Sequence, residues 1–238
     1  MKKFIPDMIT SMNLLCGIIG VVFAFKGRPD LAFILMLAAA VADFLDGLAA
    51  RALNSYSEMG KELDSLCDLV SFGVLPAVML YNCSRVCMFG ESWICWAPLL
   101  LVSLASALRL AKFNTDSRQV SGFLGLPTPA SAMIAGSLCY YVAAEPACFL
   151  AGWCAGPVFI PLLSLCLAAL MLCEIPMFSL KFHKDDSRAL NNKRMAIAFV
   201  VLAAILVVVI CRLDWSLIIL LSLTVYVLKN IVYAILKI

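Results

Sequence analysis

The segment Leu31–Ala50 reads LAFILMLAAAVADFLDGLAA: twelve consecutive apolar residues, then two acids, Asp43 and Asp46, within the last eight positions. Twenty helical residues are about 30 Å long, which matches the hydrocarbon core of a bilayer. The whole chain of 238 residues has a similar character, with 64% hydrophobic residues, 14% charged residues and a mean hydropathy of +1.02. Soluble domains are about 45–50% apolar and about 25% charged. The composition therefore indicates an integral membrane protein and excludes a soluble enzyme, a disordered tail and a nucleic-acid-binding module.

Seven further apolar runs have similar lengths, between 17 and 22 residues. With the first, they cover residues 8–25, 31–50, 64–81, 92–111, 125–144, 153–173, 195–211 and 215–236. Barrel strands would instead alternate apolar and polar residues over shorter segments. The pattern predicts an all-α integral membrane protein, residues 1–238 forming one domain with a bundle of about eight transmembrane helices.

The Lys and Arg residues divide unequally between the two sides of this predicted bundle. With eight spans, 14 of the 18 lie on the side of both termini, and only Lys26, Arg28, Arg85 and Arg212 lie on the other. Cytoplasmic loops of membrane proteins are enriched in Lys and Arg, so we expect both termini in the cytoplasm and a multi-pass protein of the cell membrane. The net charge of +3 gives no reason to expect a nucleic-acid partner.

Four aspartates lie where the second and third predicted helices approach the cytoplasmic side. Asp43 and Asp46 are three residues apart, and Asp64 and Asp68 are four apart, so each pair shares one helical face. Because a short loop joins the two helices, the pairs can face each other. Carboxylates gathered at a membrane surface repel unless a cation lies among them, and Mg²⁺ takes oxygen ligands and commonly bridges substrate phosphates. The acids therefore predict a site for a metal-bound diphosphate at the cytoplasmic face.

Small residues and one arginine accompany these acids. Gly47 and Ala50 share a face with the first pair, so a ligand or a neighbouring helix can approach the backbone closely there. Arg51 ends the second helix, where its guanidinium can pair with a phosphate. Gly60 precedes the second pair by four residues. Helix packing alone is the alternative explanation of the glycines.

Together these residues form one long pattern, Asp43-x2-Asp46-Gly47-x2-Ala50-Arg51-x8-Gly60-x3-Asp64-x3-Asp68. The pattern resembles, without a substitution, the signature that CDP-alcohol phosphatidyltransferases carry on two adjacent helices. The resemblance implies two divalent cations, Mg²⁺ or Mn²⁺, held by Asp43, Asp46, Asp64 and Asp68, with Asp68 as the general base. It also implies a CDP site lined by Asp46, Gly47, Ala50 and Gly60, with Arg51 near the phosphates.

Further segments resemble the membrane-embedded phosphatidylserine synthases of bacteria and archaea. They are Pro6–Thr10 with Asn13–Gly17, Asp64–Gly73, Arg109–Asn114, Phe123–Pro129 and Glu174–Lys181. One departure is Asp7, where that family usually has Asn. This resemblance implies transfer of the phosphatidyl group from CDP-diacylglycerol to the hydroxyl of L-serine, with release of CMP, by a homodimer in contact with membrane lipids.

The pocket for serine is the least determined part of the sequence. Serine carries a carboxylate and an ammonium, so its pocket needs a cation and hydrogen-bond acceptors. The candidates near the cytoplasmic side are Arg109, Lys112, Asn114, Arg118 and Lys181. Anchoring at the cytoplasmic surface explains the basic members of this set equally well.

Other functions are compatible with parts of the pattern. The same chemistry can act on another alcohol, such as glycerol 3-phosphate or inositol. Intramembrane prenyltransferases also bind a diphosphate through Asp clusters and Mg²⁺, but they normally have two distant clusters, and the later loops here have no second one. A cation-coupled transporter would be expected to show internal repeats and acids near the midplane, and the sequence shows neither.

Overall fold

The structure is a computed structural model that describes residues 4–53, 55, 57–87, 93–115, 123–177, 205, 208 and 214–236. Its α-helices are α1 Phe4–Phe25, α2 Pro29–Ala52, α3 Glu58–Asp68, α4 Leu75–Cys87, α5 Trp96–Thr115, α6 Thr128–Ala144, α7 Phe149–Cys154, α8 Phe159–Leu172 and α10 Ser216–Leu236. The π-helical segment η1, Leu69–Val74, joins α3 to α4, and the 3₁₀ turn η2, Trp93–Cys95, precedes α5. Strands β1, Phe123–Leu124, and β2, Pro176–Met177, form a two-residue antiparallel pair.

The prediction of a helical membrane protein is confirmed. Among the described residues, four helices are long and apolar enough to cross a membrane: Ile5–Phe25, Pro29–Ala52, Glu58–Val86 and Trp93–Thr115. The shorter apolar helices α8 and α10 follow later in the chain. The predicted helix at 195–211 lies outside the described residues except at positions 205 and 208, so the structure supports four spanning helices and does not establish the predicted eight.

Two predicted helices have different bounds in the structure. The third was expected over 64–81, but it begins at Glu58, because the hydroxyl of Ser57 caps it by accepting a hydrogen bond from the Gly60 N–H at 2.9 Å. The third helix continues through η1 and α4 to Cys87.

The run 153–173 was expected to form one helix, and this was wrong. Pro157 cannot donate a backbone hydrogen bond and disfavours helix at the residue before it, so the run divides between α7 and α8.

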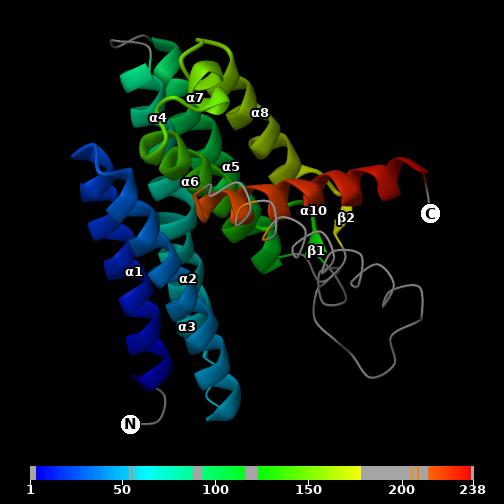
Figure 1. Ribbon diagram of the computed structural model, residues 1–238. Helices are drawn as coiled ribbons and strands as arrows, with labels where there is room; N and C mark the ends of the chain where they lie inside the picture. The colour runs from blue at the N-terminus through cyan, green and yellow to red at the C-terminus, as the bar shows by residue number, and fades with distance from the viewer. Residues whose placement is uncertain are drawn as a thin grey trace.

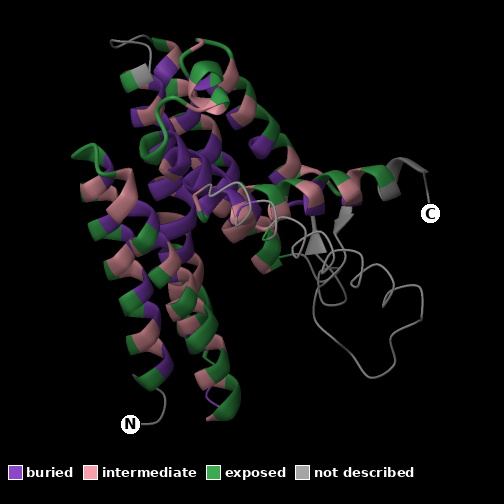
Figure 2. Ribbon diagram, viewed as in Figure 1, coloured by how far each residue is buried: buried purple, intermediate pink, exposed green. Residues whose placement is uncertain are grey.

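Figure 1 shows α1 and α2 side by side, with α3, η1 and α4 as the next long helix and α10 running across the bundle at a steep angle. A tight turn joins α1 to α2, with Gly27 at a φ of +70° and an ion pair of 2.8 Å between Arg28 and Asp30. Buried residues gather where α4, α5 and α6 meet (Figure 2). The end of the bundle at which the N-terminus lies, formed by the start of α1, the end of α2 and the start of α3, is largely exposed. The acidic signature lies toward this exposed end.

Small residues allow these helices to approach closely. A Cβ added at Gly136 of α6 would collide with the Met36 side chain and lie 2.7 Å from Cδ2 of Phe33. Likewise, a Cβ added at Gly17 of α1 would collide with the Ser71 hydroxyl and lie 3.0 Å from its Cα. Glycine at these positions therefore sets how closely α1 packs on η1 and α6 on α2.

We predict that Gly17→Ala lowers the melting temperature of the detergent-solubilised protein by several degrees. The added methyl has to displace backbone of η1, and overpacking of this kind costs about 1–3 kcal/mol. The matched control is Gly152→Ala on α7, where an added Cβ meets nothing within 4 Å. Equal melting temperatures for the two variants would contradict the close packing of α1 on η1.

Candidate active site

Helices α2 and α3 bring three of the four signature acids together. One carboxylate oxygen from each of Asp43, Asp64 and Asp68 lies within 4.8 Å of the other two. Asp68 is only 9% exposed, and the other two are half-buried. Three like charges at this separation, largely shielded from water, repel strongly. The cluster therefore requires compensating positive charge or hydrogen-bond donors.

The fourth acid, Asp46, is outside this trio. It is 6% exposed, and its Oδ2 accepts a hydrogen bond of 2.6 Å from the hydroxyl of Thr10 on α1. That hydroxyl also lies 3.0 Å from the carbonyl oxygen of Pro6, one turn earlier. Asp46 is thus oriented by α1, beside the cluster formed by Asp43, Asp64 and Asp68.

Helix α1 supplies a second donor that sequence reasoning did not assign to the site. The Nδ2 of Asn13 donates to Oδ1 of Asp68 at 3.1 Å. Thr10 and Asn13 are three residues apart and so share one face of α1. The available signal was the presence of polar side chains in an apolar run, since polar groups inside a span usually serve a specific purpose. The site therefore rests on three helices, whereas the signature lies on two.

The acids fit a divalent cation by their chemistry and by one specific atom. Hard cations such as Mg²⁺ and Mn²⁺ bind carboxylate oxygens, and the trio offers three of them. In addition, Oδ1 of Asp64 is buried and accepts no hydrogen bond from any residue that the structure describes. A buried carboxylate oxygen without a donor is a good position for a cation.

The small residues of the signature have two different surroundings. A Cβ added at Gly47 would meet nothing within 4 Å, so this glycine leaves the face of α2 open to a ligand. A Cβ at Gly60 would instead lie 2.9 Å from the Ser57 hydroxyl and 3.1 Å from Oδ1 of Asp7, which gives Gly60 a packing role. Ala50 is half-buried, and the exposed Arg51 donates from Nε to the carbonyl oxygen of Gly47 at 3.0 Å.

Of the predicted serine-binding residues that the structure describes, Arg109 alone is buried. It is 7% exposed, and its Nη1 donates to the hydroxyl of Thr128 at 2.8 Å. Its Nε has no hydrogen-bond partner in the described part of the chain. Arg109 lies on α5 between Ser106, which packs against Gly73, and Asn114, which contacts Ser65, so this stretch of α5 runs along the helix that carries Asp68. Arg109 is therefore a buried cation with one donor to spare.

The other predicted serine-binding residues lie elsewhere. Lys112 forms an ion pair of 2.8 Å with Glu174, and the amide of Asn114 donates to Ser65 at 2.9 Å. The hydrogen bond of Asn114 connects the end of α5 to α3. The ion pair of Lys112 connects the same end of α5 to the segment after α8. Arg118 and Lys181 lie outside the described residues.

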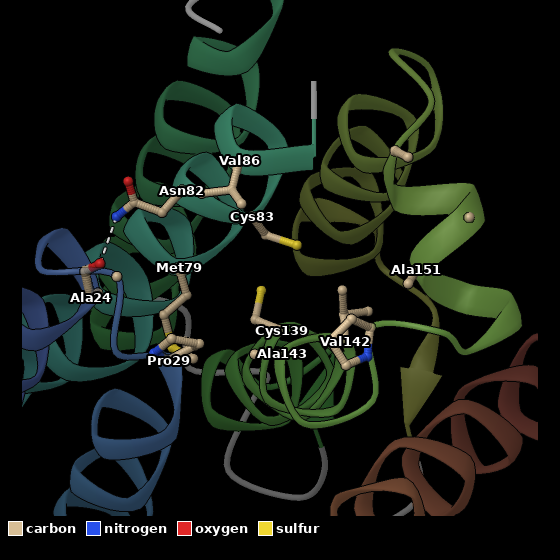
Figure 3. Close-up of a pocket in the computed structure, with 14 residues that line it drawn as sticks. Ala24, Pro29, Met79, Asn82, Cys83, Val86, Cys139, Val142, Ala143 and Ala151 are labelled. Carbon is tan, nitrogen blue, oxygen red and sulfur yellow. Dashed lines mark hydrogen bonds between the residues drawn. The ribbon is translucent and has the colours of Figure 1, made fainter. Parts of the chain in front are cut away.

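A separate apolar cavity of 530 Å³ opens at the opposite end of the bundle. It is lined by the ends of α1, α2, α4, α6 and α7, and Figure 3 shows the thiols of Cys83 and Cys139 directed into it. The amide of Asn82 lines the cavity and donates to the carbonyl oxygen of Ala24. Ala24 lies eleven residues after Asn13 on α1, which corresponds to about 16 Å along the helix axis between the cavity and the acidic cluster. The described residues that line this cavity include no charged side chain, in contrast to the acidic cluster.

The helices and acids define a helical membrane protein with a carboxylate site near one end of the bundle. Residues 3–162 match the profile of the CDP-alcohol phosphatidyltransferases. The chain belongs to the CDP-alcohol phosphatidyltransferase family.

Relatives from several organisms carry more specific names. The chain is 35% identical over 183 residues to a CDP-diacylglycerol–serine O-phosphatidyltransferase of Mycobacterium leprae, covering 74% of this chain and 58% of the relative. It is 37% identical over 131 residues to the enzyme of that name from Bacillus subtilis, covering 55% of this chain and 72% of the relative. An archaetidylserine synthase of Methanothermobacter thermautotrophicus is 36% identical over 135 residues, with 56% of each chain covered. The match thus spans between about half and three quarters of these relatives.

We predict that Asp43→Asn and Asp64→Asn each weaken Mn²⁺ binding to the purified protein by at least about tenfold. Each change removes one negative charge from the trio and so reduces its attraction for a cation. Electron paramagnetic resonance of free Mn²⁺ measures binding without turnover. Asp30→Asn, at the other end of α2, is the matched control and should bind Mn²⁺ like the wild type. Wild-type affinity in both cluster variants would show that the trio is not a metal site.

Proposed function

We propose that this protein transfers the phosphatidyl group of CDP-diacylglycerol to the hydroxyl of L-serine, giving phosphatidylserine and CMP. The observation that carries this proposal is the trio of Asp43, Asp64 and Asp68, together with a buried arginine on α5. Relatives whose names give this activity support the donor and the acceptor. A carboxylate trio suits a metal-bound diphosphate, and a buried cation suits the carboxylate of an amino acid.

In the proposed reaction, the serine hydroxyl oxygen attacks the lipid-side phosphorus of CDP-diacylglycerol. The bond between this phosphorus and the oxygen bridging to the CMP phosphate breaks, and CMP leaves. Asp68 takes the hydroxyl proton, for which its carboxylate has to lie within hydrogen-bond reach of that hydroxyl. The hydrogen bond from Asn13 holds one oxygen of Asp68 in place and leaves the other available.

Two divalent cations, Mg²⁺ or Mn²⁺, are part of the proposal, with Asp43, Asp46, Asp64 and Asp68 as the residues that hold them. When bound, such cations neutralise the diphosphate and the charge that develops on the leaving phosphate. The open face of α2 at Gly47 gives the nucleotide space beside these acids. The resemblance to the family adds Ala50 and Gly60 to the proposed nucleotide site, with Gly60 also packing against Ser57 and Asp7. Arg51, exposed at the end of α2, can turn from the Gly47 carbonyl toward a phosphate.

The location of the site completes the proposal. Placing the acids at the cytoplasmic face lets the acyl chains stay in the lipid while CDP and serine remain in water, and the distribution of Lys and Arg favours cytoplasmic termini. We propose one transferase domain of about eight spans in the cell membrane, assembled as a homodimer. Light scattering of the purified protein tests the dimer.

The direct test is CMP release by the reconstituted protein with CDP-diacylglycerol and Mn²⁺ or Mg²⁺, offering each alcohol separately. Release with L-serine, lost on addition of EDTA, is the expected result. Release with glycerol 3-phosphate or inositol instead would retain the family chemistry and overturn the serine assignment. Absence of release with every alcohol would contradict the proposed reaction.

We predict that Asp68→Asn abolishes CMP release, by at least about a hundredfold, while CDP-diacylglycerol binding stays within a few-fold of the wild type. An amide has nearly the shape of the carboxylate but cannot take the hydroxyl proton, and general-base catalysis typically contributes 10²–10⁴-fold. Binding of radiolabelled CDP-diacylglycerol reports on folding and on the donor site. Turnover close to that of the wild type would remove Asp68 as the base.

We predict that Arg109→Gln raises the KM for L-serine by about tenfold or more, because hydrogen bonds to charged groups contribute about 1.5–3 kcal/mol. The KM for CDP-diacylglycerol should change much less. Lys112→Gln is the comparison: that lysine already pairs with Glu174 at an exposed position, so its effect should be smaller. An unchanged KM for serine in Arg109→Gln would place the serine carboxylate elsewhere.

A further inference from the structure

Asn13 is held rigidly in the interior of the bundle. Its side chain is 0% exposed, and its backbone carbonyl accepts a hydrogen bond of 3.0 Å from the Ser71 hydroxyl of η1. One turn later on α1, Gly17 packs directly on the same serine. The place of Asn13 relative to α3 and η1 is therefore fixed by contacts on its own helix turn and on the next.

The orientation of its amide is fixed as well. Nδ2 donates to Oδ1 of Asp68 at 3.1 Å. A carboxylate can only accept, so turning the amide over would put two acceptors against each other. Oδ1 of Asn13 therefore keeps its place, where it is buried and receives no hydrogen bond from the residues that the structure describes. A buried acceptor without a donor costs about 1–3 kcal/mol, so a donor brought by a ligand would be bound favourably there.

The chemistry of that donor follows from the neighbouring atom. Oδ1 and Nδ2 belong to one amide, and Nδ2 already contacts Asp68. A group that binds Oδ1 therefore lies close to the acceptor hydroxyl, from which Asp68 takes the proton in the proposed reaction. In serine, a single carbon–carbon bond separates the carbon that bears the hydroxyl from the carbon that bears the ammonium. A serine hydroxyl at Asp68 thus brings an N–H donor close to Oδ1 of Asn13.

The carboxylate of serine needs a hydrogen-bond donor, and α5 offers one. Arg109 is buried on α5, and its Nε has no partner among the described residues. Serine carries a carboxylate for that donor and an ammonium for the unpaired acceptor. Glycerol 3-phosphate and inositol have no cationic group, so neither supplies a charged donor to Oδ1 of Asn13.

We propose that Asn13 is a specificity-determining residue, whose Oδ1 binds the ammonium of the amino-acid acceptor while its Nδ2 positions Asp68. This inference rests on the proposed function and extends it, because it names the group that selects an amino alcohol over other alcohols. It also gives α1 a direct part in recognition of the acceptor.

Two substitutions distinguish the role of Oδ1 from the role of Nδ2. Asn13→Ala removes both the acceptor Oδ1 and the donor Nδ2, so the KM for L-serine should rise by about tenfold or more and kcat should fall. Asn13→Asp keeps an acceptor for the ammonium but loses the N–H that holds Asp68, so kcat should fall while the KM for serine stays within about threefold of the wild type. Binding of radiolabelled L-serine to the purified variants, measured without turnover, gives the same comparison if either variant is inactive.

The control is Ser11→Ala. Ser11 is exposed on the same helix, and its hydroxyl donates to the Asp7 carbonyl oxygen at 2.8 Å. The Ser11→Ala variant should retain wild-type KM and kcat. The melting temperature of each variant in detergent shows whether the fold is intact. The Mn²⁺ concentration for half-maximal activity, measured for Asn13→Ala against Ser11→Ala, should change less than the KM for serine does.

Three results would overturn the inference. The first is an unchanged serine KM and serine affinity in Asn13→Ala. The second is a shift in the Mn²⁺ requirement with no change for serine, which would make Oδ1 a metal ligand. The third is an equal loss of serine affinity in Asn13→Ala and Asn13→Asp, which would reduce Asn13 to a packing role. Wild-type turnover with serine is measured beside them, so failure of the proposed function is recognised separately.

Discussion

The repulsion among Asp43, Asp64 and Asp68 is the constraint on which the rest of the site depends. Their oxygens lie within 4.8 Å of one another in a bundle of apolar helices, where unpaired charge is costly. Hydrogen bonds from α1 compensate in part, because Thr10 donates to Asp46 and Asn13 donates to Asp68. The repulsion that remains favours binding of positive charge at the cluster, and this is the physical reason for proposing divalent cations there.

The hydrogen bonds from Thr10 and Asn13 can reach the acids only because α1 lies tightly against the helices that carry them. Gly17 permits this contact, since any larger residue would collide with Ser71. The π-helical turn of η1 begins directly after Asp68 and includes Ser71 and Gly73, which face α1 and α5 respectively. Such turns occur frequently at functional sites, and the extra residue in the turn changes which residues face each neighbour. A single long helix thus presents acids at one end and small packing residues along its middle.

The charged residues of α5 illustrate how alike side chains acquire different roles. Lys112 pairs with Glu174 and Asn114 contacts Ser65, so both hold α5 against other parts of the chain. Arg109, one turn before Lys112, is buried, and its Nε has no partner among the described residues. These residues lie within a six-residue stretch, and burial alone separates the candidate for substrate binding from the helix anchors.

By itself, the sequence determined the membrane class, most of the helices and the acidic signature, because apolar run length and acid spacing are local properties of a chain. It could not show that Gly156–Pro157 divides a predicted span, or that η1 interrupts a regular helix. Nor did it assign Thr10 and Asn13 to the acids, since these pairs are 36 and 55 residues apart and meet only through the packing of α1 on its neighbours. The tertiary structure alone decided which polar atoms have hydrogen-bond partners and which, such as Oδ1 of Asn13 and Nε of Arg109, have none among the described residues. The reason is that a hydrogen-bond partner is defined by position in space rather than by order along the chain.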